Sequence, residues 1–305
     1  MKTEVSFPSK GLKVAGILYL PDTYSGRPLP AVVVGHPWGS VKEQTASVYA
    51  ERLAREGFAA LVFDAAHQGE SEGEPRNLED PFQRTEDFRS AVSYLASRGD
   101  IDPDRVGGLG ICASGGYLSS ASQTDRRIKA VATVSAFDIA GGLFEGVGRV
   151  QGLEVRDALL DQAGVLRNAE ARGEGVINLT LVPPTAAEAA AFPERSIYRE
   201  GHEYYRTPRA QHPRSANWAV VRADVMAQYS AFAHQSWISP RPLLMIAGTD
   251  ADTRYFSEEA IAQAAEPKEL FLIEGATHID LYDKDAYVTS AVAKLSEFFG
   301  KHLGL

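Results

Sequence analysis

The chain has 305 residues, 44% of them hydrophobic, and a net charge of −9 from 31 basic and 40 acidic residues, which is typical of a globular protein with a sizeable core. No basic run is long enough to bind phosphate backbones or anionic lipid, so neither nucleic acid nor a membrane is an expected partner. The longest apolar runs, residues 31–34 and 243–247, fall far short of the ~20 residues of a membrane span. Residues 1–10 lack a signal-peptide core, and the single cysteine, Cys112, excludes an intrachain disulfide, so we expect a cytoplasmic protein.

The hydrophobic pattern predicts alternating strands and helices. Residues 14–20 alternate loosely before a Pro-Asp turn and suggest a hairpin strand. Apolar runs at 31–35 and 58–63 enclose a helical pattern near 51–56, which indicates a parallel βαβ unit. Further strands are predicted over 105–111, 128–134, 242–247 and 269–273, and helices over 84–98, from about 114, over 257–264 and over 287–299. The expected class is α/β, with a mostly parallel sheet of about eight strands and helices on both faces.

The alternation of strands and helices is interrupted between residues 141 and 237. Two amphipathic helical patterns, 154–172 and 219–234, flank a stretch rich in Pro, Tyr and Arg. Insertions of this length in α/β domains tend to be functional lids. We therefore predict a core formed by 1–140 and 238–305, and a helical cap over 141–237.

A nucleophile is expected where the strand over 105–111 ends. Open parallel sheets bind ligands at the carboxyl ends of their strands, and the stretch Gly110-Ile-Cys-Ala-Ser-Gly-Gly116 there resembles a nucleophile elbow. The helix amino terminus and a neighbouring His should lower the pKa of the Cys112 thiol. Cys112 is preferred because it falls on the turn, whereas the alternative nucleophile, Ser114, falls within the helix. A third interpretation is that Cys112 is an inert buried residue.

The other members of a catalytic set follow later in the chain. His278, in Gly-Ala-Thr-His after the last strand, is the predicted general base. Asp252, or alternatively Asp250, should accept its Nδ1 proton, although either could merely cap the following helix. The order nucleophile, acid, histidine matches that of α/β-hydrolases. Backbone N–H groups of Ala113 and Trp38 are the predicted oxyanion donors.

These residues, with further motifs, make the chain similar to the α/β-hydrolase superfamily, in a branch related to dienelactone hydrolases and to polyketide transferases or hydrolases. The motifs are Gly35-His-Pro-Trp-Gly, Lys42-Glu-Gln-Thr45, Phe63-Asp-Ala-Ala-His-Gln-Gly-Glu-Ser71-Glu-Gly-Glu-Pro-Arg76, Asp102-Pro-Asp-Arg105, Ser239-Pro-Arg-Pro-Leu243, Tyr255-Phe-Ser-Glu258 and Ala276-Thr-His278. The resemblance implies that a cysteine can serve as nucleophile. Two departures stand out: Ser114 replaces the second glycine of Gly-x-nucleophile-x-Gly, and the acid loop is one residue longer than usual if Asp252 is used.

The stretch His202-Glu-Tyr-Tyr-Arg-Thr-Pro-Arg209, with Asn217-Trp218, resembles the cap of the same branch. Its aromatic rings could stack on an acyl chain, and its arginines could pair with a carboxylate or phosphate. Alternatively, the tyrosines pack the cap on the core while the arginines are solvated. The candidate substrate contacts are His36, Tyr204, Tyr205, Arg209 and Trp218.

The expected function is hydrolysis of an ester, lactone or thioester through a covalent acyl-enzyme on a Cys-His-Asp triad. The alternatives are an acyltransferase that uses the same triad and a binding protein that kept the fold without turnover. The expected partner is a small-molecule acyl substrate, and the sequence leaves a homo-oligomer open. No cofactor or metal is expected, since no His or Cys spacing matches a metal site.

Overall fold

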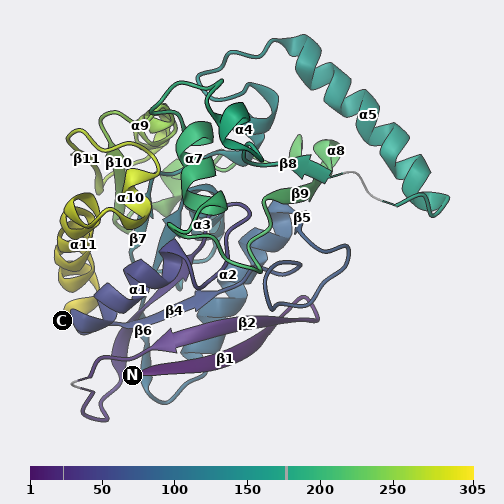
Figure 1. Ribbon diagram of the computed structural model, residues 1–305. Coiled ribbons are helices and arrows are strands. Elements are labelled where there is room, and N and C mark those ends of the chain that lie inside the picture. Colours follow the sequence, from purple (N-terminus) through teal and green to yellow (C-terminus); the bar gives the residue numbers. More distant parts are fainter. Residues whose placement is uncertain (23, 176–177) are drawn as a thin grey trace.

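The computed structural model describes residues 1–22, 24–175 and 178–305, and its centre is a large twisted sheet flanked by helices (Figure 1). This sheet has eight strands in the order β1-β2-β4-β3-β6-β7-β10-β11. β2 pairs antiparallel with β1 and β4, whereas the other neighbouring strands are parallel. The predicted α/β class with a mostly parallel sheet is confirmed. The strands are β1 (Lys2–Ser9), β2 (Leu12–Tyr19), β3 (Leu29–Gly35), β4 (Ala59–Phe63), β6 (Ile101–Ile111), β7 (Val131–Val134), β10 (Leu243–Gly248) and β11 (Lys268–Ile273).

Helices cover both faces of this sheet. A Cβ atom on Gly108 of β6 would meet Leu118 of α3 (Ala113–Thr124), and one on Gly107 would meet Phe299 of α11 (Asp285–Phe299). Because successive strand residues face opposite sides, α3 and α11 lie on opposite faces. α2 (Pro81–Ala96) packs beside α3, and α1 (Thr45–Arg55) packs beside α11. The remaining core helices are α9 (Arg254–Gln263), the short α10 (Asp280–Asp283) and a final π-helical turn (Gly300–Gly304).

A second, three-stranded sheet has the order β5-β9-β8, with β5 (Leu78–Glu79), β9 (Trp218–Val221) and β8 (Asn178–Thr180). Around it lie α4 (Ile139–Phe144), α5 (Leu153–Ala171), α6 (Ala186–Ala189), α7 (Ile197–Arg206), α8 (Ala223–Met226) and the 3₁₀-helix η1 (Gln235–Ile238). The prediction of a helix over 219–234 is wrong, because the chain there forms β9 and then only the short α8. The β-branched Val220 and Val221 pair with β5, so tertiary pairing overrides the helical pattern. The division at residues 140 and 237 stays a prediction.

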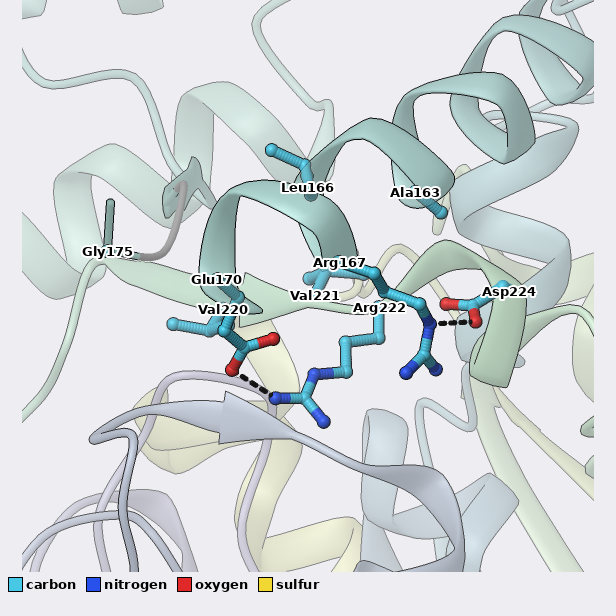
Figure 2. A pocket seen from close by; sticks show the side chains of 9 residues that line it. All are labelled: Ala163, Leu166, Arg167, Glu170, Gly175, Val220, Val221, Arg222 and Asp224. Atoms are coloured by element: carbon cyan, nitrogen blue, oxygen red, sulfur yellow. Dashed lines mark hydrogen bonds and ion pairs between the residues drawn. The ribbon is translucent and has the colours of Figure 1, made fainter. Parts of the chain in front are cut away.

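The predicted helix over 154–172 is confirmed as α5, which projects from the rest of the molecule in Figure 1. Most of its side chains are exposed, and Ala163 is the one that is buried. Figure 2 shows the groove between α5 and β9, where Arg167 pairs with Asp224 and Arg222 with Glu170, each at 2.6 Å. Because such exposed ion pairs stabilise by only ~0–1 kcal/mol each, α5 is held loosely to the second sheet. Within the described residues, no helix combines the length and apolarity needed to cross a membrane.

Candidate active site

Cys112 lies on the turn between β6 and α3, with φ 56° and ψ −124°. A positive φ at a residue other than glycine is strained and persists only where the surroundings fix it. The turn also requires Gly110, because a Cβ atom there would lie 2.2 Å from the Ser114 carbonyl oxygen. The backbone of residues 110–114 therefore has the geometry of a nucleophile elbow, with Cys112 at its tip.

Ser114, the alternative nucleophile, faces away from this tip. It belongs to the first turn of α3, where its hydroxyl donates to the carbonyl oxygen of His36 at 2.6 Å and accepts from Arg84 at 3.1 Å. Only 1% of the side chain is exposed. The Ser114 hydroxyl thus joins α3 to α2 and to the loop after β3.

His36 is a buried structural residue of that loop. Its Nδ1 lies 2.7 Å from the Pro37 carbonyl oxygen, and its Nε2 accepts the Ala65 N–H at 3.0 Å. Burial, with the neighbouring Arg84 guanidinium, holds the pKa of His36 well below its usual range. The ring therefore stays neutral and fixes the loop that carries Trp38.

The Cys112 thiol is almost fully buried. Burial raises its pKa, and four groups partly oppose this effect: the Tyr282 hydroxyl, the backbone N–H groups of Ala113 and Trp38, and the charge of Arg84. The expectation of a lowered thiol pKa is therefore wrong, because the cost of desolvating a thiolate exceeds the help from the helix terminus. The two N–H groups predicted as oxyanion donors both act on this thiol by lowering its pKa. Their catalytic role stays a prediction.

His278 lies between β11 and α10 and is fully buried. Its Nδ1 is 2.5 Å from the Thr253 hydroxyl, and its Nε2 is 3.1 Å from the Tyr282 hydroxyl. Burial lowers the pKa of His278 to about 3, so the imidazole is neutral near pH 7. It therefore supplies no positive charge to the resting thiol.

Neither candidate acid contacts His278. One carboxylate oxygen of Asp252 accepts the Ile197 N–H at 3.0 Å, and the other has no hydrogen-bond partner among the described residues. Asp250 is half-exposed and pairs with Arg195 at 2.7 Å. The expected aspartate hydrogen bond to Nδ1 is not formed in this structure, and Thr253 occupies that position.

Sequence reasoning missed both hydroxyls that contact the His278 ring. Thr253 directly follows Asp252, and Tyr282 lies four residues after His278. A hydroxyl after a strand is too common a feature to single out. The position of Tyr282 depends on how α10 packs, which no local pattern encodes.

A cavity of about 100 Å³ opens beside Cys112. It is lined by core and cap residues that are mostly apolar or aromatic, and none of those described carries a charge. Its lining comprises Trp38, Cys112, Phe137, Gly142, Val147, Leu181, Val182, Ile197, Tyr198, Gly201, Tyr205, Ile279 and Tyr282. Such a lining suits an uncharged organic group.

Among the predicted substrate contacts, Tyr205 lines this cavity and the others do not. Tyr204 is buried behind it, with its ring 5.2 Å from that of Tyr282. Arg209 pairs with Asp283 at 2.8 Å. Trp218 is partly exposed on β9. The packing interpretation therefore describes Tyr204 better than substrate contact does. Arg209 is not solvated as that interpretation expected, because it is paired with Asp283 and lies over the Tyr204 ring.

An ion cluster forms around the buried Lys42, in the loops that follow β3 and β4. The Lys42 ammonium contacts Asp64 at 2.7 Å, Glu70 at 2.6 Å and Glu43 at 2.8 Å. Arg214 from the cap pairs with Glu43 and Glu70. These charges connect core loops to the cap. Among the described residues, no cluster of His, Cys, Asp and Glu side chains is arranged to hold a metal ion.

The model of the family described as X-Pro dipeptidyl-peptidase (S15 family) matches residues 10–237. The chain is 37% identical to the uncharacterized protein PA2218 of Pseudomonas aeruginosa, over 98% of this chain and 80% of that protein. The crystal structure of PA2218 superposes with a TM-score of 0.92 at 36% identity, covering 99% of this chain and 94% of that one. The whole fold is thus shared with a solved relative.

Several relatives carry names that state an activity, and two of them are fungal proteins named for acyl chemistry. The thiohydrolase aneE of Aspergillus aculeatus is 36% identical over 44% of this chain and 43% of its own length. The acyltransferase drtE of Aspergillus calidoustus is 25% identical over 89% of this chain and 87% of its own. The α/β hydrolase GrgF from Penicillium, 21% identical with full coverage of both chains, superposes with a TM-score of 0.82 and so shares the fold.

Proposed function

The chain belongs to the X-Pro dipeptidyl-peptidase (S15) family and is an enzyme of the α/β-hydrolase type, and we propose that it hydrolyses a neutral ester, lactone or thioester through an acyl-enzyme on Cys112. The observation that carries this proposal is the position of the thiol. Cys112 sits at the tip of a strained elbow and at the wall of an apolar cavity, next to two backbone N–H donors. This is where a nucleophile and an oxyanion hole are needed.

The proposed reaction has two halves. The sulfur attacks the substrate carbonyl carbon while its proton passes toward His278, and the Trp38 and Ala113 N–H groups stabilise the oxyanion. The intermediate collapses to a thioester as the leaving alcohol or thiol takes a proton. Water, deprotonated with His278 as the final base, then attacks the thioester, releases the acid and restores the thiol.

The third member of the set differs from the sequence-based triad. Thr253 takes the place beside Nδ1 that was expected for Asp252. Asp252 accepts the N–H of Ile197 at the start of α7, a cap helix whose residues line the cavity. We therefore assign to Thr253 the orientation of the imidazole, and to Asp252 the positioning of the cap.

The uncharged lining argues for a neutral acyl group and against a dipeptide. A peptide amino terminus is a cation, and a buried cation requires a paired carboxylate. None of the described residues that line the cavity supplies one. Although the family is named for a peptidase, the cavity of this chain fits a neutral carbonyl compound better.

Acyl transfer is the second candidate, because the relative named as an acyltransferase aligns over 89% of the chain. The same thioester would then be resolved by an alcohol or an amine. Product analysis with an added acceptor alcohol distinguishes the two. Free acid alone supports hydrolysis, and an ester of the acceptor supports transfer.

The proposal is tested with matched esters that differ only in the end of the acyl chain, such as nitrophenyl hexanoate and its analogue ending in a carboxylate. A proline dipeptide anilide completes the set. We expect the neutral ester to react at least about tenfold faster than the anionic one, since burying an unpaired carboxylate is costly. Cys112→Ala should abolish turnover, whereas Ser114→Ala should retain it. Equal turnover by Cys112→Ala, or preference for the anilide, would refute the proposal.

A further inference from the structure

We propose that Tyr282 is a catalytic residue that relays the proton between the Cys112 thiol and Nε2 of His278. The inference rests on the proposed function, because it concerns the same nucleophile and base. Nothing in the sequence motifs assigns a role to this tyrosine. It is the juxtaposition of three side chains from separate elements that suggests one.

The Tyr282 hydroxyl stands between the two reacting groups. It lies 3.1 Å from Nε2 of His278 and close enough to the thiol to favour the ionised form of Cys112. The tyrosine also lines the cavity. The two nitrogens of the imidazole contact the hydroxyls of Thr253 and Tyr282.

The position of this hydroxyl is fixed from several sides. The Thr45 hydroxyl of α1 donates to the Tyr282 carbonyl oxygen at 2.9 Å. The Tyr49 hydroxyl, also from α1, donates to the Leu281 carbonyl oxygen at 2.7 Å. The Tyr204 ring packs edge-on against the Tyr282 ring. A short helix anchored in this way presents its tyrosine as a rigid group, as proton transfer requires.

The hydrogen bonds give each of the two protons in the relay a donor and an acceptor. With Nδ1–H donating to Thr253, Nε2 keeps a lone pair and accepts the Tyr282 O–H. As sulfur forms a bond to the carbonyl carbon, its proton moves to the Tyr282 oxygen, and the tyrosine proton moves to Nε2. The tyrosine ends neutral, the imidazole is protonated and the negative charge lies on the substrate oxyanion. When the leaving group departs, the proton on Nε2 moves to the Tyr282 oxygen, and the tyrosine proton moves to the leaving group and neutralises it.

Burial makes such a concerted path necessary. It lowers the pKa of His278 to about 3 and raises that of Cys112, so a resting thiolate–imidazolium pair is strongly disfavoured. A relay avoids forming that pair ahead of the attack. It also keeps the cavity free of charge before substrate binds.

The relay is tested by the alkylation of Cys112 with iodoacetamide across pH, followed by intact mass. The chain has one cysteine, so each adduct reports on this thiol. Tyr282→Phe should alkylate at least about tenfold more slowly at pH 7, with a profile displaced by one pH unit or more upward. Tyr19→Phe is the matched control, because it removes a buried tyrosine hydroxyl of β2 that donates to Ser47 at 2.9 Å and lies outside the cavity lining. It should stay within about twofold of wild type. Overlapping profiles for Tyr282→Phe and wild type would overturn the relay.

A measurement on the wild type alone covers the case in which Tyr282→Phe does not fold. Acylation by a neutral ester is followed in mixtures of H₂O and D₂O. Two protons in flight give a curved dependence of rate on deuterium fraction, and a linear dependence would overturn the relay. Failure of the proposed function looks different, because Cys112 would then gain no acyl group from any ester while its alkylation still depended on Tyr282.

Discussion

Cys112 and Lys42 follow the adjacent strands β6 and β3, yet the cavity beside Cys112 and the ion cluster around Lys42 contain opposite kinds of side chain. No described residue of the cavity lining is charged. The cluster gathers several charges around a lysine that is only 2% exposed. Buried charge thus holds the loops after β3 and β4 to residues of the predicted cap, whereas neutral groups line the cavity beside Cys112.

The largest change, a loss of stability, is expected when a buried charge is removed. Lys42→Met leaves the fully buried Asp64 without its cation, which should lower the free energy of unfolding by ~3–5 kcal/mol. Arg214→Met is the control, because its ion pairs are partly exposed, and it should lose no more than ~1 kcal/mol. Urea denaturation measures both. Similar losses for the two variants would contradict the structural role given to Lys42.

Because His278 is buried in its neutral form, we expect the free energy of unfolding to depend on pH. Its pKa is lowered to about 3 in the folded protein, whereas the unfolded chain binds this proton near pH 6.5. The unfolded state therefore gains the proton first, and the stabilisation is lost as pH falls from 6.5 toward 3, by about 1.4 kcal/mol per pH unit.

His278→Gln removes this one titration and leaves the others in place. Subtracting its free energy of unfolding from that of the wild type should give a difference that falls with acidification below pH 6.5. Urea melts at pH 7, 6 and 5 are sufficient. A difference that is constant over this range would mean that His278 takes up its proton in the folded protein at the same pH as in the unfolded chain.

A smaller effect should separate Thr253 from Asp252. Thr253→Val removes the acceptor beside Nδ1 and should slow acylation of Cys112 by roughly tenfold or more, since the imidazole loses its orientation. Asp252→Asn keeps an oxygen for the Ile197 N–H, so we expect a change under about threefold. Stopped-flow acylation by an activated ester measures both. The reverse order would return the orienting role to Asp252.

The smallest effect is expected at Arg209. Its guanidinium pairs with Asp283 and lies over the Tyr204 ring, outside the cavity lining. Arg209→Gln should therefore change the ratio of KM values for neutral and carboxylate-bearing esters by less than about twofold. A selective rise of KM for the anionic ester would show that this arginine binds substrate.

Local sequence patterns were sufficient to predict the central sheet and the turn that carries Cys112. Continuous apolar runs mark β3, β4 and β10, and Gly110 before Cys112 marks a turn that tolerates no side chain. The error over 219–234 arose where pairing with β5 determined the structure. A helical pattern there could not reveal a strand partner more than a hundred residues away.

The chemistry of the site depends more on distant contacts. The sequence pointed to Cys112 and His278, but not to the hydroxyls of Thr253 and Tyr282 between which the imidazole lies. It also predicted a lowered thiol pKa, because it could not show how completely the folded chain buries the thiol. Burial and hydrogen-bond partners belong to the assembled fold, and they decide protonation.

The most direct test of the account is intact-protein and peptide mass spectrometry after brief mixing with nitrophenyl hexanoate. We expect one acyl group on the peptide that contains Cys112, retained in Ser114→Ala and lost in Cys112→Ala. An adduct on Ser114, or turnover of the ester by wild type with no acyl group on Cys112, would contradict the thioester mechanism.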